Sequence, residues 1–441
     1  MTNQTNLFSE ESPKIGPVLH NWCRDLWPIP RSLTGPGVRT TLNYLNTKLG
    51  GRLNIHAVPS GQPVFDWTIP DEWTIRDAWI EDGQGEQLID FQKNNLHVIG
   101  YSEPVDQWLD LGELQQHLYS IPELPNAIPY ITSYYKRRWG FCLSEEKRRS
   151  LVPGRYRAVV DSDLQPGVLN YGELVIPGET EQEVLLSTYI CHPSMANNEL
   201  SGPVVTTAIA QWLESLQRRR YTYRIVYVPE TIGSLAFLSR NLDHLKSRVV
   251  AGFNVSCVGD ERCYSYLPSR KGDTPSDQVA KHVLLHIDPN FISYTWLDRG
   301  SDERQYCSPG IDLPIASIMR SKYGTYPEYH TSLDNLSFVT PDGLSGGYWA
   351  LKRAILTIEE NFTPITTVLG EPQLGRRGLY STLGARLNDG ELPLVLNILT
   401  YCDGQHSLLD IADLIGKSFF EVKDLAERLE AKGLIARKCV S

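Results

Sequence analysis

Apolar residues in the middle of the chain recur with two alternating spacings. The runs at 183–189 and 223–228 are short and rich in β-branched, aromatic and aliphatic residues, which predicts buried strands. Each is followed by a segment with apolar residues at helical spacing, at 204–213 and 235–242. The alternation continues through strands at 249–258 and 314–319 and helices at 277–286 and 343–361. This order predicts an α/β fold in which a mostly parallel sheet carries helices on both faces.

Between residues 60 and 120 the pattern changes to short runs that are aromatic and rich in β-forming residues. We therefore predict a small β-rich domain at 60–120, inserted into an α/β domain that consists of residues 1–60 and 120–365. Beyond the insertion, the runs at 154–160 and 167–175 are expected to pair as antiparallel strands.

The end of the chain has a separate pattern of short helices. After a segment punctuated by glycine and proline, helical spacing recurs at 392–399, 407–416 and 419–432. Ser407 is a favourable N-cap and Gly416 a favourable stop for the second helix. A short apolar run follows the third helix, as in a helix-turn-helix with a wing. Residues 366–441 are therefore predicted to form a winged-helix domain.

The charge of the predicted third helix bears on what the winged helix binds. Residues 419–432 carry four acidic side chains against three basic ones, and the whole chain has a net charge of −10. Binding to the phosphates of a nucleic acid requires a basic face. We expect the winged helix to bind a protein partner or a second copy of the chain, and keep DNA recognition as the alternative.

Composition places the chain among ordinary globular proteins. Its apolar fraction is 41% and its charged fraction 21%. No apolar run approaches the roughly 20 residues of a membrane-spanning helix, and the polar start lacks the pattern of a signal peptide. The eight cysteines are scattered without a Cys-x-x-Cys pair. We expect a cytoplasmic protein that is not bound to membranes and has no disulfide framework.

Residues that could bind a metal ion or transfer a proton lie in the loops that follow the predicted strands. These loops contain His192 with Asn198 and Glu199, then Glu230, then Asp302 with Glu303, then His330 with Asp334. The carboxyl ends of parallel strands meet at one edge of a sheet, where binding sites form. Each residue alone is accounted for as a packed histidine or a capping carboxylate. Together, histidines and carboxylates are the ligands of catalytic zinc, which keeps one position open for water.

Three of these loops resemble a known family. Residues 191–202 (CHPSMANNELSG), 229–234 (PETIGS) and 329–334 (YHTSLD) are similar to motifs of the aminopeptidase-like zinc proteins associated with polysaccharide biosynthesis, relatives of the zinc leucyl-type aminopeptidases. The resemblance extends to 27–35 and 65–73. It implies an aminopeptidase-like α/β core, an inserted small domain and a C-terminal winged helix.

The resemblance also implies roles for individual residues. His192, Asp302 and His330 would be zinc ligands, and Glu230 would be the general base. The family pattern has an aspartate that bridges two zinc ions where this chain has Asn198, and a glutamate ligand where it has Thr231. Because an amide is a poor bridge and threonine a weak ligand, we predict a single zinc ion.

These residues predict a zinc-dependent hydrolase that cleaves the N-terminal bond of a peptide, or another small amide. Zinc would polarise water and the scissile carbonyl, and a tyrosine such as Tyr329, Tyr326 or Tyr306 would donate to the oxyanion. The aromatic segment that includes Tyr134, Tyr135 and Trp139 could wall the cleft. The alternative is a catalytically silent scaffold or binding protein in a biosynthetic pathway.

Overall fold

The computed structural model describes residues 12–134, 136–377, 379 and 391–438. The start of the predicted α/β domain, Tyr135 and part of the glycine- and proline-rich segment before the winged helix lie outside the described residues. The chain forms two compact units, Met1–Asp277 with Phe291–Leu351 and Gln278–Asn290 with Lys352–Ser441. The helices α7 (Pro275–Ile287) and α9 (Pro341–Glu360) contribute residues to both units.

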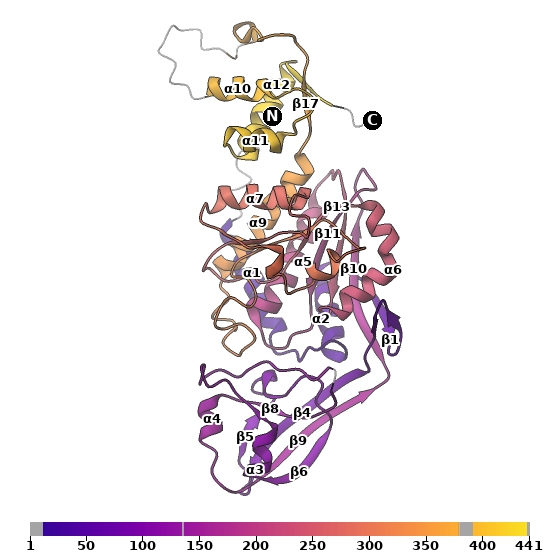
Figure 1. Ribbon diagram of the computed structural model, residues 1–441, viewed down its shortest axis with the longest axis vertical. Coiled ribbons are helices and arrows are strands. Elements are labelled where there is room, and N and C mark those ends of the chain that lie inside the picture. The colour runs from indigo at the N-terminus through magenta and orange to yellow at the C-terminus, as the bar shows by residue number, and fades with distance from the viewer. Residues whose placement is uncertain (1–11, 135, 378, 380–390, 439–441) are drawn as a thin grey trace. The chain divides into compact units, whose positions relative to one another are not determined.

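The first unit is built on an eight-stranded sheet of order β1-β10-β12-β11-β13-β16-β14-β15 (Figure 1). Its strands are β1 (Asn54–Pro59), β10 (Val168–Ile176), β11 (Glu183–Tyr189), β12 (Thr222–Val228), β13 (Val249–Asn254), β14 (Ser265–Leu267), β15 (Ile292–Ser293) and β16 (Ile315–Met319). The central strands β12, β11, β13 and β16 run parallel, whereas β10 and β14 join them by antiparallel pairing. The side chains of β11 and β16 are all buried, which explains their apolar runs.

Helices cover both faces of this sheet. Successive residues of a strand point to opposite faces, and α2 (Pro36–Lys48) approaches β10 at Gly172, where a Cβ would lie 2.8 Å from a methyl carbon of Leu42. The preceding residue, Tyr171, meets Phe237 of α6 (Ile232–Arg248) with ring centroids 6.1 Å apart. Helices α1 (Ser12–Leu26) and α5 (Ser201–Ser215) pack with each other, and α5 also packs with α2. The predicted α/β architecture is therefore confirmed.

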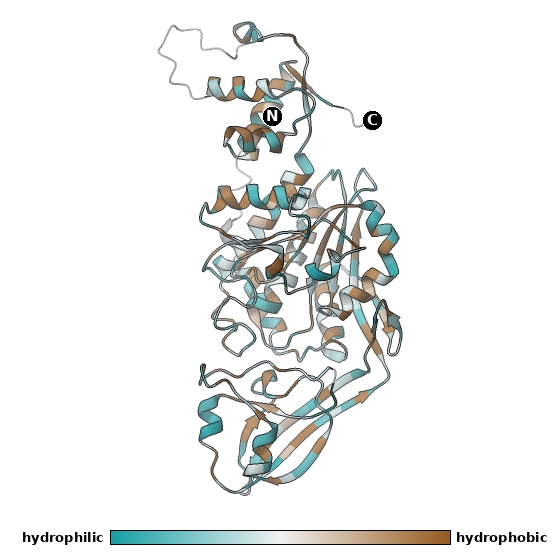
Figure 2. Cartoon of the chain, in the orientation of Figure 1, coloured by the Kyte–Doolittle hydropathy of each residue, from teal (hydrophilic) through white to brown (hydrophobic). Residues whose placement is uncertain are grey.

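The β-rich segment forms an antiparallel sheet, to which a strand beyond residue 120 also contributes. Its antiparallel sheet has the order β5-β4-β9-β6, with β4 (Glu72–Asp82), β5 (Gln87–Asp90), β6 (Val105–Asp110) and β9 (Arg155–Gln165). The prediction that 154–160 pairs with 167–175 is wrong, because β9 pairs with β4 and β6 while β10 joins the large sheet. In Figure 2 the long strands of the insertion alternate between brown and teal, the pattern of a sheet with one buried face.

Shorter elements complete the insertion and its surroundings. They are β2 (Pro63–Val64), β3 (Trp67–Thr68), β7 (Leu118–Tyr119), β8 (Phe141–Cys142), α3 (Leu111–Leu114) and α4 (Glu145–Arg149).

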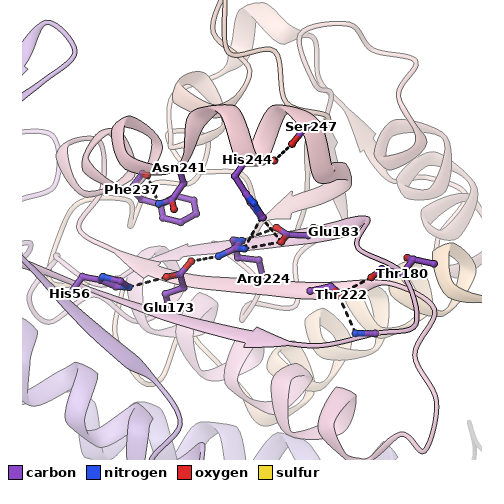
Figure 3. A network of polar contacts seen from close by, with 11 residues as sticks. His56, Glu173, Thr180, Glu183, Thr222, Arg224, Phe237, Asn241, His244 and Ser247 are labelled. Atoms are coloured by element: carbon purple, nitrogen blue, oxygen red, sulfur yellow. Dashed lines mark hydrogen bonds and ion pairs between the residues drawn. The ribbon is translucent and has the colours of Figure 1, made fainter.

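A network of charged side chains ties β10, β11, β12 and α6 together (Figure 3). Arg224 of β12 pairs with Glu183 at the start of β11, with Nε 2.7 Å from Oε2, and with Glu173 of β10. His244 of α6 lies 2.7 Å from the Glu183 carboxylate, and His56 lies 2.9 Å from that of Glu173. Since a buried carboxylate is costly unless it is paired, these contacts allow Glu183 to begin a buried strand.

The second unit contains the winged helix. Its helices are α10 (Glu391–Thr400), α11 (Leu408–Ile415) and α12 (Phe419–Ala431), and its antiparallel wing pairs β17 (Pro364–Thr366) with β18 (Ile435–Arg437). Ser407 and Ser418 cap α11 and α12 by accepting from Asp410 N and Glu421 N. Gly416 ends α11 in the left-handed conformation, as the sequence predicted.

Among the described helices of both units, none is long and apolar enough to cross a membrane.

Candidate active site

Three of the predicted site residues lie in loops at the carboxyl ends of the central strands. His192 follows β11, Glu230 follows β12, and His330 lies in the segment after β16. Ile190 N donates to Val228 O, so the first two loops leave the sheet side by side. Asp302 occupies the N-cap position of the short helix α8 (Glu303–Tyr306). The topology thus places the candidate residues at one edge of the sheet, as expected for an open α/β fold.

His192 is held by a buried carboxylate and a buried guanidinium. Its Nδ1 donates to Glu199 Oε2 at 2.8 Å, and its carbonyl accepts from Arg31 Nε at 3.0 Å. Arg31 Nε also lies 3.7 Å from Glu199 Oε1, and both side chains are fully buried. Glu199 reaches the ring from the π-helical turn Ala196–Leu200 that precedes α5. This arrangement orients the ring, so that Nε2 faces the site and lies 3.5 Å from Glu230 Oε2.

Sequence reasoning missed the supporting role of these two residues. In the sequence, Glu199 stands out only as a member of the turn, and Arg31 only as part of the similar segment 27–35. The signal available was weak, because Arg31 and His192 are 161 positions apart in the chain. Two buried charges at those positions are explained once the fold brings them together.

Glu230, which is partly buried, and Asp302, which is fully buried, are two acids that influence each other's pKa. Asp302 Oδ1 accepts from Thr231 N at 2.7 Å and from Ser234 Oγ at 2.8 Å, whereas its buried Oδ2 has no hydrogen-bond partner among the described residues. Burial, followed by the negative charge of Glu230, raises the pKa of Asp302 to about 8. Burial also raises the pKa of Glu230, against the positive charges of His192 and Arg304. A cation at this point would relieve the repulsion between the two carboxylates.

His330 presents a neutral ring at the same site. Burial, together with His192, lowers the pKa of His330 to about 3, and its buried Nε2 has no hydrogen-bond partner among the described residues. The ring stacks on Tyr329 with centroids 3.9 Å apart, and its centroid lies 5.3 Å from that of His192. Tyr130 contacts both histidine rings, at 5.2 and 5.1 Å. A neutral imidazole with a free nitrogen is the form that binds metals.

Two of the predicted carboxylates have structural roles instead. Glu303 Oε1 accepts from Gly300 N and Ser301 N, and Tyr323 Oη donates to it at 2.6 Å. Asp334 accepts from Asn197 N and Asn198 N at 2.6 and 2.9 Å and so holds the turn before α5. Both are fully buried, and their bonds explain why a carboxylate is needed at each position.

The hydroxyls of the three candidate tyrosines differ in their partners. Tyr306 Oη is bonded to Ser187 Oγ at 2.7 Å, and Tyr326 Oη donates to Asp334 at 3.1 Å. Burial raises the pKa of Tyr329 above its usual range, so its hydroxyl stays protonated. Of the three, Tyr329 is the one that stacks directly on His330.

One cluster of possible metal ligands lies on the Nδ1 side of His192. Among the described residues, one group of three His, Cys, Asp or Glu side chains offers ligand atoms that all lie within 4.8 Å, namely Cys191, His192 and Glu199. Burial raises the pKa of Cys191 to about 11, so its thiol is neutral, and the charge of Arg31 lies beside Glu199. We interpret this group as the hydrogen-bonded support of His192 Nδ1 rather than as a cation site.

The donors on the other side of the ring fit one cation better. His192 Nε2, Asp302 Oδ2 and His330 Nε2 are of the right type, and the last two are buried without hydrogen bonds to any described residue. The three do not all lie within 4.8 Å of one another, so their role as ligands stays a prediction. A second cation has poorer donors, because Asn198 offers an amide and Thr231 Oγ1 accepts from the cationic Arg304 at 2.7 Å.

A cavity of about 370 Å³ is lined by His192, Glu230 and His330. Trp67 of the insertion and Tyr134 form part of its wall, so the inserted domain helps to shape the site. Trp139 packs against His117 and Phe141 instead, and Tyr135 lies outside the described residues. A cavity of this size suits a small ligand.

Comparisons with known proteins agree with this architecture. Residues 20–361 match the family model described as a domain of unknown function (DUF4910), and residues 363–437 match a winged helix-turn-helix. A Clostridium acetobutylicum protein, named for polysaccharide biosynthesis and an aminopeptidase-like domain, is 43% identical over 97% of this chain and 98% of its own.

Solved structures of other proteins are similar to this fold. A crystal structure from C. acetobutylicum whose name describes a peptidase is 42% identical, covers 97% of this chain and 98% of its own, and has a TM-score of 0.91. A zinc aminopeptidase from Bacillus subtilis is 12% identical over 79% of this chain and 94% of its own, with a TM-score of 0.54. At that identity the likeness concerns the fold alone.

Proposed function

This chain belongs to the aminopeptidase-like family associated with polysaccharide biosynthesis, and we propose that it hydrolyses a peptide bond or another small amide with a single zinc ion. The observation that carries the proposal is the pair of buried ligand atoms without hydrogen bonds to any described residue, Asp302 Oδ2 and His330 Nε2. His330 lines the cavity together with Glu230, and Asp302 is bonded to Thr231 of the same lining. A buried polar atom without a partner costs free energy, and such a cost is explained when the atom has a ligand.

His192, Asp302 and His330 would hold the zinc ion. When bound, zinc supplies Lewis acidity to a carbonyl oxygen and lowers the pKa of water. Glu230 lies on the cavity wall with a pKa that burial raises, so it can take a proton from water and return it to the leaving amine. Tyr329, whose raised pKa keeps its hydroxyl protonated, would donate a hydrogen bond to the oxyanion that develops on the substrate.

Substitution of the base tests this proposal. We expect Glu230→Gln to retain zinc while the rate of amide hydrolysis falls at least about 100-fold, the usual contribution of a general base. A panel of aminoacyl anilides and N-acyl amides, followed by release of the amine, measures the rate. Unchanged turnover in the variant would contradict the role of Glu230, and loss of zinc would make it a ligand instead.

A silent scaffold is the second candidate, favoured by Asn198 and by the contact of Thr231 with Arg304. Under this alternative the chain keeps the fold and uses the winged helix to hold a partner. It predicts that the wild-type chain hydrolyses none of the panel, with and without added zinc.

A further inference from the structure

Arg304 lies on the wall of the cavity with most of its donors uncommitted. Its Nη2 donates to Thr231 Oγ1 at 2.7 Å, and the side chain is otherwise exposed. Among the described residues, no carboxylate lies within the 4.0 Å of an ion pair with its guanidinium. A guanidinium has five N–H donors in a planar fork, so the group can take a ligand without losing its bond to Thr231.

The charged residues that line the cavity favour some substrates over others. Glu230 is the one carboxylate among the lining residues, and Arg304 adds a permanent positive charge on the same wall. The free ammonium of a peptide N-terminus would have the proposed general base as its single carboxylate partner and would be repelled by Arg304. A substrate with a free ammonium, such as the N-terminus of a peptide, therefore has little support from this lining. An anion has Arg304 as its partner and leaves the carboxylate of Glu230 free to act as the general base.

The neighbours of Arg304 limit the charge of that anion. Gln305 and Thr132 are neutral donors on the lining, and Trp67 and Tyr134 provide flat apolar walls. One guanidinium balances the single charge of a carboxylate, whereas the second charge of a dianionic phosphate would have no place in the fork and would add to the repulsion from Glu230. A planar carboxylate also matches the two parallel N–H groups of the fork.

We propose that Arg304 forms a carboxylate-binding subsite, so that the substrate is an N-acyl amide with a carboxylate close to the scissile bond and no free ammonium. This inference rests on the proposed hydrolase function for the identity of the ligand as substrate. The binding of a carboxylate at Arg304 can be measured without turnover.

The test compares ligands that differ in one charge. Calorimetric titration of the full-length chain with N-acetylglycine and with N-acetylglycinamide gives the two Kd values. Because a hydrogen-bonded charge contributes about 1.5 to 3 kcal/mol, we expect the carboxylate to bind roughly 10- to 150-fold more tightly. The Arg304→Gln variant should lose this preference while its affinity for the neutral amide stays the same.

Matched variants and a second anion show whether the preference belongs to the guanidinium of Arg304. Arg299→Gln removes a nearby exposed arginine that lies over Trp296 and is absent from the lining, and it should keep the preference. Arg304→Lys retains the charge without the fork and should show an intermediate preference. N-acetylaminomethylphosphonate, which carries up to two charges, should bind less tightly than N-acetylglycine.

Three results would overturn the proposal: equal affinities in the wild-type chain, a preference that survives Arg304→Gln, or tighter binding of the phosphonate. The same experiments distinguish failure of the subsite from failure of the proposed hydrolase function. Binding of the carboxylate without hydrolysis of any amide would remove the hydrolase function and leave the subsite, whereas hydrolysis without preference for an anion would remove the subsite alone.

Discussion

The support of His192 decides how well its Nε2 can bind a ligand. Glu199 orients the ring from one side and is itself paired with Arg31, and all three groups are buried. A carboxylate bonded to the far nitrogen of a histidine raises its basicity and fixes its orientation. The charge of Glu199 also compensates that of Arg31, which would otherwise be an unpaired cation in the interior.

Substitution of Glu199 should therefore affect both metal binding and stability. We expect Glu199→Gln to lower zinc affinity by about 10- to 100-fold, measured by competition with a chelator. The free energy of unfolding should fall by about 3 kcal/mol, because the substitution leaves Arg31 buried without a counter-charge. The matched control is Glu145→Gln, because the ion-pair partner of Glu145, Arg149, is largely exposed. This variant should change neither the zinc affinity nor the free energy of unfolding. Wild-type zinc affinity in the Glu199 variant would contradict this role.

At the scale of elements, the turn between β11 and α5 depends on close packing. Gly202 lies in the first turn of α5, and a Cβ there would be 2.4 Å from both Val255 O and Thr188 Oγ1. Such distances require a shift of backbone. The helix can therefore approach the sheet this closely because residue 202 is a glycine, and its approach fixes the turn that contains Glu199.

Gly202→Ala is expected to destabilise the protein by about 1–3 kcal/mol, the usual cost of overpacking, as measured by urea unfolding. Gly112→Ala is the control, since a Cβ at Gly112 meets nothing within 4 Å. A fully stable Gly202→Ala chain would show that α5 can move away from the sheet without cost.

The charged network around Glu183, at the start of β11 and away from the site, predicts that the stability of the fold depends on pH (Figure 3). Burial raises the pKa of Glu183, but the hydrogen bonds and charges of Arg224 and His244 lower it by more. The pKa of Glu183 in the folded protein therefore lies below the ordinary 4.5. Ionised Glu183 therefore stabilises the fold above about pH 4.5, and this contribution disappears as the pH falls through its folded pKa. We expect Glu183→Gln to be less stable than wild type at pH 7, with a difference that shrinks in acid. Urea unfolding at several pH values measures it, and a constant difference would contradict the assignment.

The elements were predictable from sequence where one local rule decided them. The buried runs of β11 and β16 and the caps of α11 were predicted correctly, because burial and capping leave a local pattern. The partner of β9 was not, since the choice between β4 and β10 depends on contacts far apart in sequence. Among site residues, His192 and Glu230 were visible as polar groups after apolar runs, whereas Arg31 and Arg304 became meaningful through tertiary contacts.

At the scale of the whole molecule, the charges of the winged helix bear on what it binds. Lys423 of α12 pairs with Glu360 and Glu427, at 3.0 and 3.2 Å, so one of the few basic groups of this helix is neutralised within its own unit. This pairing supports the proposal of a protein partner or self-association over DNA recognition.

We accordingly expect no measurable binding of a random 20-base-pair duplex by the full-length chain. Fluorescence anisotropy in 50 mM salt is the measurement, and the reason is the shortage of free cations to replace counterions. A Kd below about 10⁻⁶ M that weakens steeply with added salt would restore the DNA-binding alternative.

The zinc content of the purified chain tests the central claim most directly. Elemental analysis should find about one zinc per chain, since His192, Asp302 and His330 are the types of donor that would hold one zinc ion. His330→Ala should reduce the content to near zero, and His406→Ala, which removes a part-exposed histidine of the second unit, should leave it unchanged. No zinc in the wild-type chain even after zinc addition, or two tightly bound ions, would contradict the single-metal account.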